Sequence, residues 1–349
     1  MNNFDINKLT RTNVLNMKPY ASARDEFKDF KHEMIYLDAN ENPFDNGLNR
    51  YPDPQQLELK ELIAEKRNVK VENILIGNGS DEVLDLLFRA FCEPNKDNVI
   101  TLPPTYGMYE VLANLNAVEN RAVLLNDDFQ PDAEAILSKT DENTKILFLC
   151  SPNNPTGNSF SDKIIFELLS NFNGLILIDE AYIDFSEKDS WLLLLKEYPN
   201  LVICQTLSKA YAMAGVRIGL LYGSAEIISI LNKIKPPYNI NVLSQEKAIK
   251  KIQQSTLEFQ VKKIITEREK LTKELKKITF IEKVITSDAN FILVKVDDAT
   301  LRYNQFIENG IVVRNRSNQP LCENCLRITI GTKEENEKVI QLLKTLQNA

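Results

Sequence analysis

The sequence is poor in histidine: His32 is the one histidine among 349 residues. Nucleophilic catalysis by Ser-His or Cys-His pairs, and metal sites built from several histidines, all need imidazole side chains. The sequence therefore excludes these mechanisms. His32 itself lies in the polar stretch 29–34, where we expect its side chain to be solvated. Any proton transfer that this protein carries out must use another base.

Long apolar runs and clusters of positive charge are also missing. Apolar runs such as 175–178 and 191–195 are far too short to span a bilayer. The first residues, MNNFDINKLT, lack the apolar core of a secretory signal. The net charge is -7, and no group of Lys and Arg residues outweighs its acidic neighbours, as binding to a nucleic-acid backbone would require. We therefore expect a cytoplasmic protein that binds neither membranes nor nucleic acids.

The five cysteines do not form a recognisable metal-binding pattern. Cys150 and Cys204 lie within apolar runs, where a thiol behaves as a small hydrophobic group. Cys322 and Cys325 have the CxxC spacing of metal and redox sites. A second CxxC pair is missing, however, and structural zinc normally takes four ligands. We expect no metal and interpret Cys322 and Cys325 as reduced thiols of a surface loop, with any further role left open.

Residues 73–223 alternate short β-branched runs with amphipathic stretches, a pattern that predicts βα units around a mostly parallel sheet. A helix is expected directly after the first strand, because apolar residues recur at helical spacing over 83–91. The expected strands are 74–76, 98–102, 146–150, 175–178, 201–205 and 218–222, the last of them a candidate antiparallel strand.

The rest of the chain predicts a second, smaller α/β unit. Residues 243–278 are charged and almost free of glycine and proline, which indicates a long helix or a pair of helices. A final helix is introduced by Thr332, because Glu335 three residues later completes a capping box. The expected strands of this unit are 291–296, 311–313 and 326–330.

Four polar segments follow expected strands: GNGSDE (77–82), SPNNPTG (151–157), DEAY (179–182) and TLSKAYAMAGVR (206–217). Ligands of open α/β sheets bind beyond the carboxyl ends of the strands, so these segments are candidates for a site. Ser80 and Asp81 would begin a helix whose free N–H groups attract an anion, although a turn with an N-cap explains them equally well. Asp179, at the end of an apolar run, would need a cationic partner unless it caps a helix.

Lys209 follows the strand expected at 201–205, with Ser208 before it and Arg217 eight residues later. A buried lysine has a lowered pKa and can act first as a nucleophile and then as a base. Lys209 could therefore supply the proton carrier that the lack of histidine requires. Taken alone, a lysine in a loop is more often a solvated surface charge.

In their order and spacing, the four segments resemble the fold-type-I, class-II aminotransferases that depend on pyridoxal 5′-phosphate (PLP). The resemblance covers nearly the whole chain. It implies a mostly parallel seven-stranded sheet in a large domain, with a smaller α/β domain built from the N-terminal arm and the C-terminal segment. The implied divisions are an arm over residues 1–40, a large PLP-binding domain over 41–242 and a small domain over 243–349.

The resemblance also implies a role for each matching residue. Lys209 would form the Schiff base with PLP and afterwards carry the transferred proton, and Asp179 would keep the pyridine nitrogen protonated. Asn154 and Tyr182 would hydrogen-bond the phenolic oxygen, and Tyr106 would stack on the ring unless it only packs in the core. The residues implied to bind the cofactor phosphate are Gly79, Ser80, Asp81, Ser208 and Arg217.

Further segments resemble one branch of this family, the histidinol-phosphate aminotransferases: KPYASARDE (18–26), LDANENPF (37–44), RYPDPQ (50–55), PPTYGMYE (103–110) and the ending over 310–332. In that branch the tyrosine corresponding to Tyr51 reaches the cofactor phosphate of the neighbouring subunit. The resemblance therefore implies a homodimer with shared active sites.

The same branch implies a substrate site in which arginine binds both carboxylate and phosphate, since its planar fork matches either group. Arg327 would take the α-carboxylate of glutamate or the substrate phosphate, with Arg314 and Tyr20 assisting, and Asn42 belongs to the implied site. We favour Arg314 because it stands directly after the apolar run 311–313. Arg316 we interpret as a solvated strand end.

The implied reaction is a transamination in L-histidine biosynthesis. Glutamate leaves as 2-oxoglutarate, and imidazole acetol phosphate takes up the amino group to give L-histidinol phosphate. An aromatic amino-acid aminotransferase or a threonine-phosphate decarboxylase of the same fold is the nearest alternative. A PLP-sensing regulator would need a fused DNA-binding module, for which the chain leaves no room before 18–26. A nucleotide-dependent oxidoreductase would need the glycine fingerprint GxGxxG. In this chain Glu82 stands at the position of its last glycine.

Overall fold

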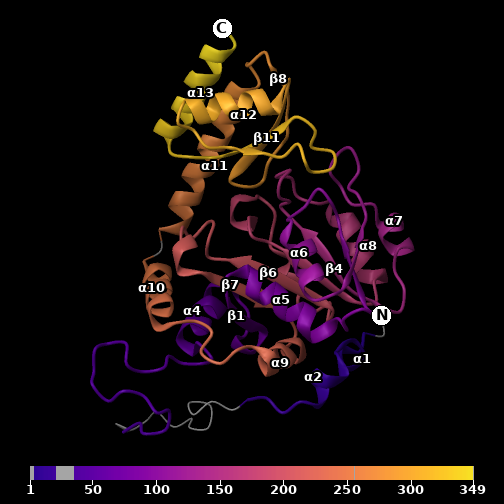
Figure 1. Ribbon diagram of the computed structural model, residues 1–349, viewed down its shortest axis with the longest axis vertical. Helices are drawn as coiled ribbons and strands as arrows, with labels where there is room; N and C mark the ends of the chain where they lie inside the picture. The colour runs from indigo at the N-terminus through magenta and orange to yellow at the C-terminus, as the bar shows by residue number, and fades with distance from the viewer. Residues whose placement is uncertain (1–3, 21–34, 255, 349) are drawn as a thin grey trace.

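The computed structural model describes residues 4–20, 35–254 and 256–348, and these form a large and a small β-sheet with helices around them (Figure 1). The strands are β1 (Ile74–Asn78), β2 (Asn98–Thr101), β3 (Glu119–Ala122), β4 (Thr144–Cys150), β5 (Leu175–Asp179), β6 (Leu201–Thr206), β7 (Ile218–Tyr222), β8 (Ile281–Val284), β9 (Phe291–Val296), β10 (Arg314–Asn315) and β11 (Cys325–Thr329). The α-helices are α1 (Ile6–Leu9), α2 (Thr12–Asn16), α4 (Leu57–Arg67), α5 (Ser80–Phe91), α6 (Met108–Leu115), α7 (Ala133–Ser138), α8 (Asp162–Asn171), α9 (Ala225–Ile234), α10 (Val242–Gln253), α11 (Leu257–Leu275), α12 (Ala299–Glu308) and α13 (Lys333–Leu346). The short 3-10 helices of the described residues are η1 (Val71–Asn73), η2 (Ile183–Phe185), η3 (Trp191–Leu194) and η4 (Ala214–Val216).

The large sheet confirms the expected seven-stranded, mostly parallel architecture. Its strand order is β1-β7-β6-β5-β4-β2-β3, and β7 runs antiparallel to both β6 and β1, whereas the strands from β6 to β3 are parallel. Every residue of β5 and β6 is buried, so helices must cover both faces. Parallel strands present their carboxyl ends at one edge, which is where the candidate segments begin.

The apolar runs of the central strands supply two cores, one on each face of the large sheet. Successive side chains of a strand point to opposite faces. In β4, accordingly, Leu147 and Leu149 belong to one apolar cluster, and Phe148 and Cys150 belong to the other. A third cluster packs the small sheet, of order β10-β11-β9-β8, against α11, α12 and α13.

Three strands differ from the expectation. The edge strand β3 has the sequence ENRA, and β8 has IEKV with exposed central residues, so neither carries the apolar run by which strands were predicted. A strand was expected at 311–313, but the strand found in this region, β10, begins at Arg314, directly after the expected range. Gly310 adopts a φ of +74° after α12, and the N–H of Ile311 donates to the carbonyl of Phe306. Residue 311 therefore completes the end of a helix, as glycine at a C-terminus allows.

The charged stretch 243–278 forms a pair of helices, as predicted. Helix α10 packs against α4 of the large domain, so it lies with that domain although the expected division fell at residue 242. Helix α11 runs from the large domain to the small sheet (Figure 1): Val261 belongs to a core of the large sheet, and Leu271 and Leu275 belong to the core of the small one. The predicted capping box of Thr332 and Glu335 begins α13.

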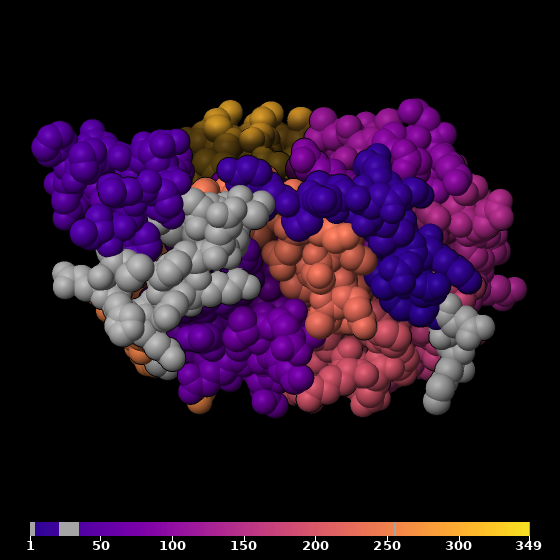
Figure 2. Space-filling view, turned by 90° about the horizontal axis from the view of Figure 1, so that it is seen from below, coloured from indigo at the N-terminus to yellow at the C-terminus, as the bar shows by residue number. Residues whose placement is uncertain are grey.

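The described part of the N-terminal arm lies on the large domain. The backbone N–H of Arg11 donates to the carbonyl of Ala90 over 2.9 Å, and Val14 is 3% exposed in the core beside α5 and α9. We expected the arm to contribute to the small domain, but these contacts are with helices of the large one. Figure 2 shows this indigo segment crossing the lower face of the molecule. Residues 21–34, His32 among them, lie outside the described residues.

Among the described residues, no helix combines the length and the apolar character that crossing a membrane requires.

Candidate active site

The structure brings the four predicted segments together at the carboxyl ends of the parallel strands. Backbone hydrogen bonds join the beginnings of these segments to neighbouring strands. The N–H of Ser151 donates to the backbone carbonyl of Asp179, the N–H of Glu180 to that of Cys204, and the N–H of Leu207 to that of Ile218. A β-bridge between Gly79 and Ile218 adds the segment after β1. The strand topology alone therefore gathers residues that are far apart in the sequence.

Asp179 is the buried carboxylate of this edge. It ends β5 between Cys150 of β4 and Cys204 of β6, and it is 3% exposed. Its side chain accepts hydrogen bonds from the hydroxyl of Tyr109 over 2.7 Å and from the N–H of Ala181 over 3.1 Å. Burial raises the pKa of this carboxyl to about 6, although the Tyr109 hydrogen bond opposes the shift. A cationic ligand at this position would favour the ionised form.

Tyr109 is a residue of the candidate site for which we predicted no role. It lies at the start of α6, is fully buried, and packs its ring on Phe148 with centroids 4.9 Å apart. Burial and the neighbouring Asp179 raise the pKa of its hydroxyl, which keeps it protonated as a hydrogen-bond donor. A tyrosine on the buried face of a helix was the available signal, because a buried hydroxyl usually has a partner.

Lys209 lies in the turn after β6, where its carbonyl accepts from the N–H of Ala212. Its side chain stays exposed, and the ammonium nitrogen lies 5.8 Å from the ring centroid of Tyr182. Partial desolvation lowers the pKa of this amine, the positive charges of Arg327 and Arg217 lower it further, and Asp179 opposes them. The negative charge of Asp179 therefore acts on the amine of Lys209.

A tight cradle lies at the start of α5. Gly79 has a φ of +85°, and a Cβ atom there would lie 2.5 Å from a terminal guanidinium nitrogen of Arg217. A Cβ atom on Gly219 would lie 2.3 Å from the backbone of Gly79 and Ser80. Nearby, the hydroxyls of Thr206 and Ser208 are 3.0 Å apart. Free N–H groups of a helix start, a hydroxyl and an arginine fork together suit a phosphate group.

Tyr106 is half-buried between this cradle and Asp179. Its hydroxyl donates to the carboxylate of Asp81 over 3.0 Å, and its ring meets that of Tyr109 edge-on, with centroids 5.5 Å apart. Tyr106 therefore presents an aromatic surface at the site, beyond the core packing that was the simpler explanation.

Arg327 of β11 connects the small sheet to the large domain. Its guanidinium donates to the side-chain oxygen of Asn154 and lies 5.1 Å from the ring centroid of Phe291. Phe291 in turn contacts the buried ring of Tyr182 edge-on. An arginine predicted to bind substrate and two residues predicted to bind the cofactor ring are thus in one contiguous group.

Arg316 belongs to the same surroundings, which corrects its interpretation as a solvated strand end. It is half-buried, and its Nε atom is enclosed without a hydrogen-bond partner. Arg314, which we preferred, is the exposed member of the pair, although it lies directly opposite Arg327 in the sheet.

Cys322 and Cys325 are not surface thiols either. Cys322 is completely buried and Cys325 is 3% exposed, and both belong to an apolar cluster of the large domain. Two turns, closed by hydrogen bonds from Cys322 to Gln319 and from Cys325 to Cys322, fold the loop inward. In the described part of the chain, no group of three or more His, Cys, Asp or Glu residues is arranged to hold a metal ion.

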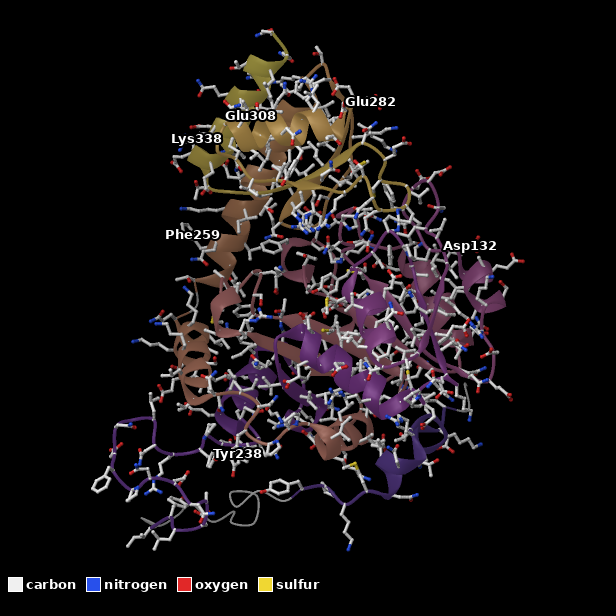
Figure 3. The ribbon with its side chains drawn as sticks, viewed as in Figure 1. Asp132, Tyr238, Phe259, Glu282, Glu308 and Lys338 are labelled. Carbon is white, nitrogen blue, oxygen red and sulfur yellow. The ribbon has the colours of Figure 1, made fainter. Side chains whose placement is uncertain are left out.

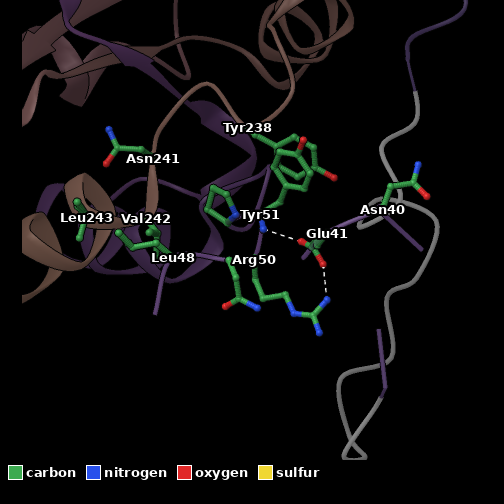
Figure 4. Close-up of a pocket in the computed structure, with 11 residues that line it drawn as sticks. Asn40, Glu41, Leu48, Arg50, Tyr51, Tyr238, Asn241, Val242 and Leu243 are labelled. Atoms are coloured by element: carbon green, nitrogen blue, oxygen red, sulfur yellow. Dashed lines mark hydrogen bonds and ion pairs between the residues drawn. The ribbon is translucent and has the colours of Figure 1, made fainter. Parts of the chain in front are cut away.

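Three further predicted site residues lie elsewhere in this chain. Tyr20 and Asn42 are exposed, and the Asn42 side chain accepts from the N–H of Phe44. Tyr51 stacks on Tyr238 with ring centroids 4.5 Å apart, beside a cavity of about 510 Å³ (Figure 4). Tyr238 lies at the end of the molecule away from the small domain (Figure 3). The described contacts join none of the three to Lys209.

Comparisons with known proteins agree with this arrangement. A model of the family described as aminotransferase class I and II matches residues 16–343. Histidinol-phosphate aminotransferase of Flavobacterium psychrophilum is 71% identical over 346 residues, which are 99% of this chain and 100% of that protein. The crystal structure of the Clostridium acetobutylicum histidinol-phosphate aminotransferase superposes with a TM-score of 0.80 at 28% identity, covering 86% of this chain and 91% of that one. The fold also matches that of the Sinorhizobium meliloti enzyme in complex with PLP, with a TM-score of 0.77 at 23% identity over 85% of this chain and 84% of that one.

Proposed function

Because the chain belongs to the aminotransferase class I and II family, we propose that it transfers an amino group between L-histidinol phosphate and 2-oxoglutarate, with PLP as its cofactor, in L-histidine biosynthesis. The products are imidazole acetol phosphate and L-glutamate. The observation that carries the proposal is the pairing of β5 with β6: Asp179 ends β5 and Lys209 lies in the turn after β6, so both residues are at one edge of the sheet. The substrate is proposed from the full-length similarity to histidinol-phosphate aminotransferases and from the arginines of the small sheet.

The residues at this edge fit PLP. The cradle of Gly79, Ser80 and Arg217 suits its phosphate, with Ser208 and Asp81 adjacent. When bound, PLP supplies a protonated pyridine ring that stabilises the electron pair left on the substrate carbon after proton removal. We propose that the ionised carboxylate of Asp179 faces the ring nitrogen, because a buried anion gains most from a cation beside it.

The polar and aromatic neighbours would fix the orientation of the ring. Asn154 and Tyr182 lie on the side of the site that faces the small domain, where they can hydrogen-bond the phenolic oxygen. Tyr106 offers its ring as a stacking surface. Tyr109, through its hydrogen bond, holds the Asp179 carboxylate in one orientation and so acts as a positioning residue.

Lys209 would perform the proton transfer. Its lowered pKa increases the fraction of neutral amine at neutral pH, which is the form that acts as nucleophile and base. The amine would remove the proton from the amine-bearing carbon of the substrate. Arg327 and Arg217 favour the neutral form of Lys209 and would also bind the anionic groups at either side of it.

We also propose that the active protein is a homodimer in the cytoplasm, with Tyr51 of each subunit completing the site of the other. The segment before Tyr51 projects at one corner of the molecule (Figure 2) and carries strongly exposed apolar side chains. These are Ile35, Leu37, Phe44 and Leu48, exposed by 87%, 87%, 80% and 56%. Exposed apolar groups of this kind indicate a surface that another subunit covers. The five free cysteines suit a reducing compartment.

A half-reaction tests the proposed function. L-Histidinol phosphate added to the purified protein with bound PLP should abolish the long-wavelength cofactor absorbance in one turnover, and 2-oxoglutarate should restore it. L-Phenylalanine and O-phospho-L-threonine serve as parallel substrates. Rapid exchange with phenylalanine, or release of carbon dioxide from phosphothreonine, without any reaction of histidinol phosphate would overturn the proposal in favour of the two alternative activities.

A further inference from the structure

The small sheet presents three arginines on one face. Arg314 lies opposite Arg327 across β10 and β11, and the N–H of Arg316 extends the ladder to the carbonyl of Cys325 over 2.8 Å. Alternate residues of a strand share a face, so Arg314, Arg316 and Arg327 lie on the same side. Leu326, on the other side, is buried in the core of the small domain.

This arginine face is turned toward the large domain. Cys325, which shares the face, belongs to an apolar cluster of the large domain, as does Cys322. Arg327 reaches Asn154 in the segment after β4, and Tyr182 is among the groups that act on the charge of Arg316. Arg316 is therefore at the wall of the proposed active site, beside the residues that would hold the cofactor ring.

The three arginines have no acidic partner among the described residues. By contrast, two other half-buried arginines have one: Arg67 pairs with Asp184 over 2.9 Å, and Arg302 pairs with Asp297 over 2.6 Å. The Nε atoms of Arg316 and Arg327 are both enclosed and without hydrogen-bond partners. Burial and the charges of Arg327 and Arg314 lower the pKa of Arg316 to about 10, as expected for a cation that lacks an anion.

We infer that Arg316 is a third ligand of the substrate's anionic end and makes the site prefer a doubly charged phosphate monoester over a carboxylate. This inference rests on the proposed function and names the residue that selects the substrate class. A phosphate dianion offers three oxygens and two charges to three guanidinium groups, whereas a carboxylate offers two oxygens and one charge. Loss of Arg316 should therefore weaken the binding of histidinol phosphate much more than the binding of glutamate.

The test compares Arg316→Gln with wild type in both half-reactions. We expect the KM for histidinol phosphate to rise at least about tenfold, as for loss of a charge-assisted hydrogen bond, and the KM for glutamate to change less than about threefold. Inorganic phosphate serves as a competitive inhibitor of the PLP-loaded enzyme. Its inhibition constant should rise by the same factor as the KM for histidinol phosphate. Arg121→Gln, which removes a charge from an ion pair at the edge strand β3, is the control and should leave both KM values unchanged.

Two results would overturn the inference: equal rises of both KM values, which indicate a structural role, or unchanged phosphate inhibition. Arg316→Lys, which keeps the charge but not the planar fork, should give an intermediate KM for histidinol phosphate and serves if the glutamine variant does not fold. Failure of the wild type to react with histidinol phosphate would instead contradict the proposed function. Phosphate binding by the wild type that depends on Arg316 would still support the anion site in that case.

Discussion

Asp179 shows how a single residue is prepared for a ligand. Its carboxyl has an ordinary pKa of 3.8, and burial raises this pKa to about 6 while Tyr109 supplies the hydrogen bond that limits the shift. In the PLP-free protein, keeping this group ionised therefore has a free-energy cost, even with the charge of Lys209 acting on it. A protonated pyridine nitrogen would remove much of that cost, so the energy of burial favours cofactor binding.

The sign of this shift leads to a prediction for the PLP-free protein. Between about pH 4 and pH 6 the folded state binds the proton of Asp179 more tightly than the unfolded chain, so stability falls as pH rises through this window. At pH 7.5 the full penalty, about 3 kcal/mol for two pKa units, is present. We expect PLP-free Asp179→Asn to melt at a higher temperature than wild type at pH 7.5 and at a similar temperature at pH 4. Thermal unfolding at both pH values measures this, and a variant that is less stable at pH 7.5 would contradict it.

Single residues could be predicted where their position along a strand was sufficient. Asp179 and Lys209 became candidates because each follows an apolar strand, their roles were predicted from the family resemblance, and the pairing of β5 with β6 brings the two segments to one edge. Tyr109 and Arg316 could not be found in this way, because their importance depends on the groups opposite them in space: Asp179 for the tyrosine, and two other arginines for Arg316.

At the scale of elements, the junction of β1 with α5 is the part of the candidate site that leaves the least room for larger side chains. Gly79 combines a left-handed φ with contact to Arg217, and Gly219 of β7 packs against the same backbone. Only a residue without a Cβ atom satisfies both conditions at position 79. The sequence GNGSDE predicted an anion site weakly, because the contribution of β7 to the cradle is visible only in the folded sheet.

Gly79→Ala tests this junction. The new methyl group would collide with Arg217, so we expect the dissociation constant for PLP to rise at least about tenfold, with a loss of stability of about 1–2 kcal/mol from the backbone conformation. Gly310→Ala is the matched control: its φ is +74°, but nothing lies within 4 Å of the added Cβ atom. The control should lose similar stability and keep its PLP affinity. Equal PLP affinity in both variants would show that the cradle does not bind the phosphate.

Other elements show why sequence patterns find buried strands best. The apolar runs of β4, β5 and β6 follow from burial on both faces, and they were predicted within one or two residues. The edge strand β3 and the two-residue β10 are held by backbone hydrogen bonds to a neighbour, which almost any side chain permits. Their existence depends on the neighbouring strand and leaves little trace in composition.

At the scale of the whole molecule, the structure separates the predicted site residues into two groups. One group surrounds Lys209, and the other, with Tyr51, lies on a projecting segment with exposed apolar side chains. A symmetric dimer would bring the second group of one subunit to the first group of the other. The sequence indicated this division only through the family resemblance, because no local pattern shows which subunit a residue serves.

Complementation between two impaired variants tests the shared site. Lys209→Ala and Tyr51→Ala should each be nearly inactive as pure proteins. When both are co-expressed, half of the dimers are mixed, and each mixed dimer has one site with both defects and one with neither, so about one quarter of wild-type activity should return. A mixture that stays as inactive as its components would show that Tyr51 serves its own subunit or none.

Whether Lys209 holds the cofactor is measured most directly by reducing the PLP-loaded protein with borohydride, digesting it and locating the phosphopyridoxyl group by mass spectrometry. Reduction makes the bond between PLP and an amine permanent, so the labelled peptide identifies the amine that holds the cofactor. We expect label on Lys209 alone, at a stoichiometry approaching one per chain, and no label in Lys209→Ala. Label on another lysine, or an unlabelled protein that still transaminates, would contradict this role of Lys209.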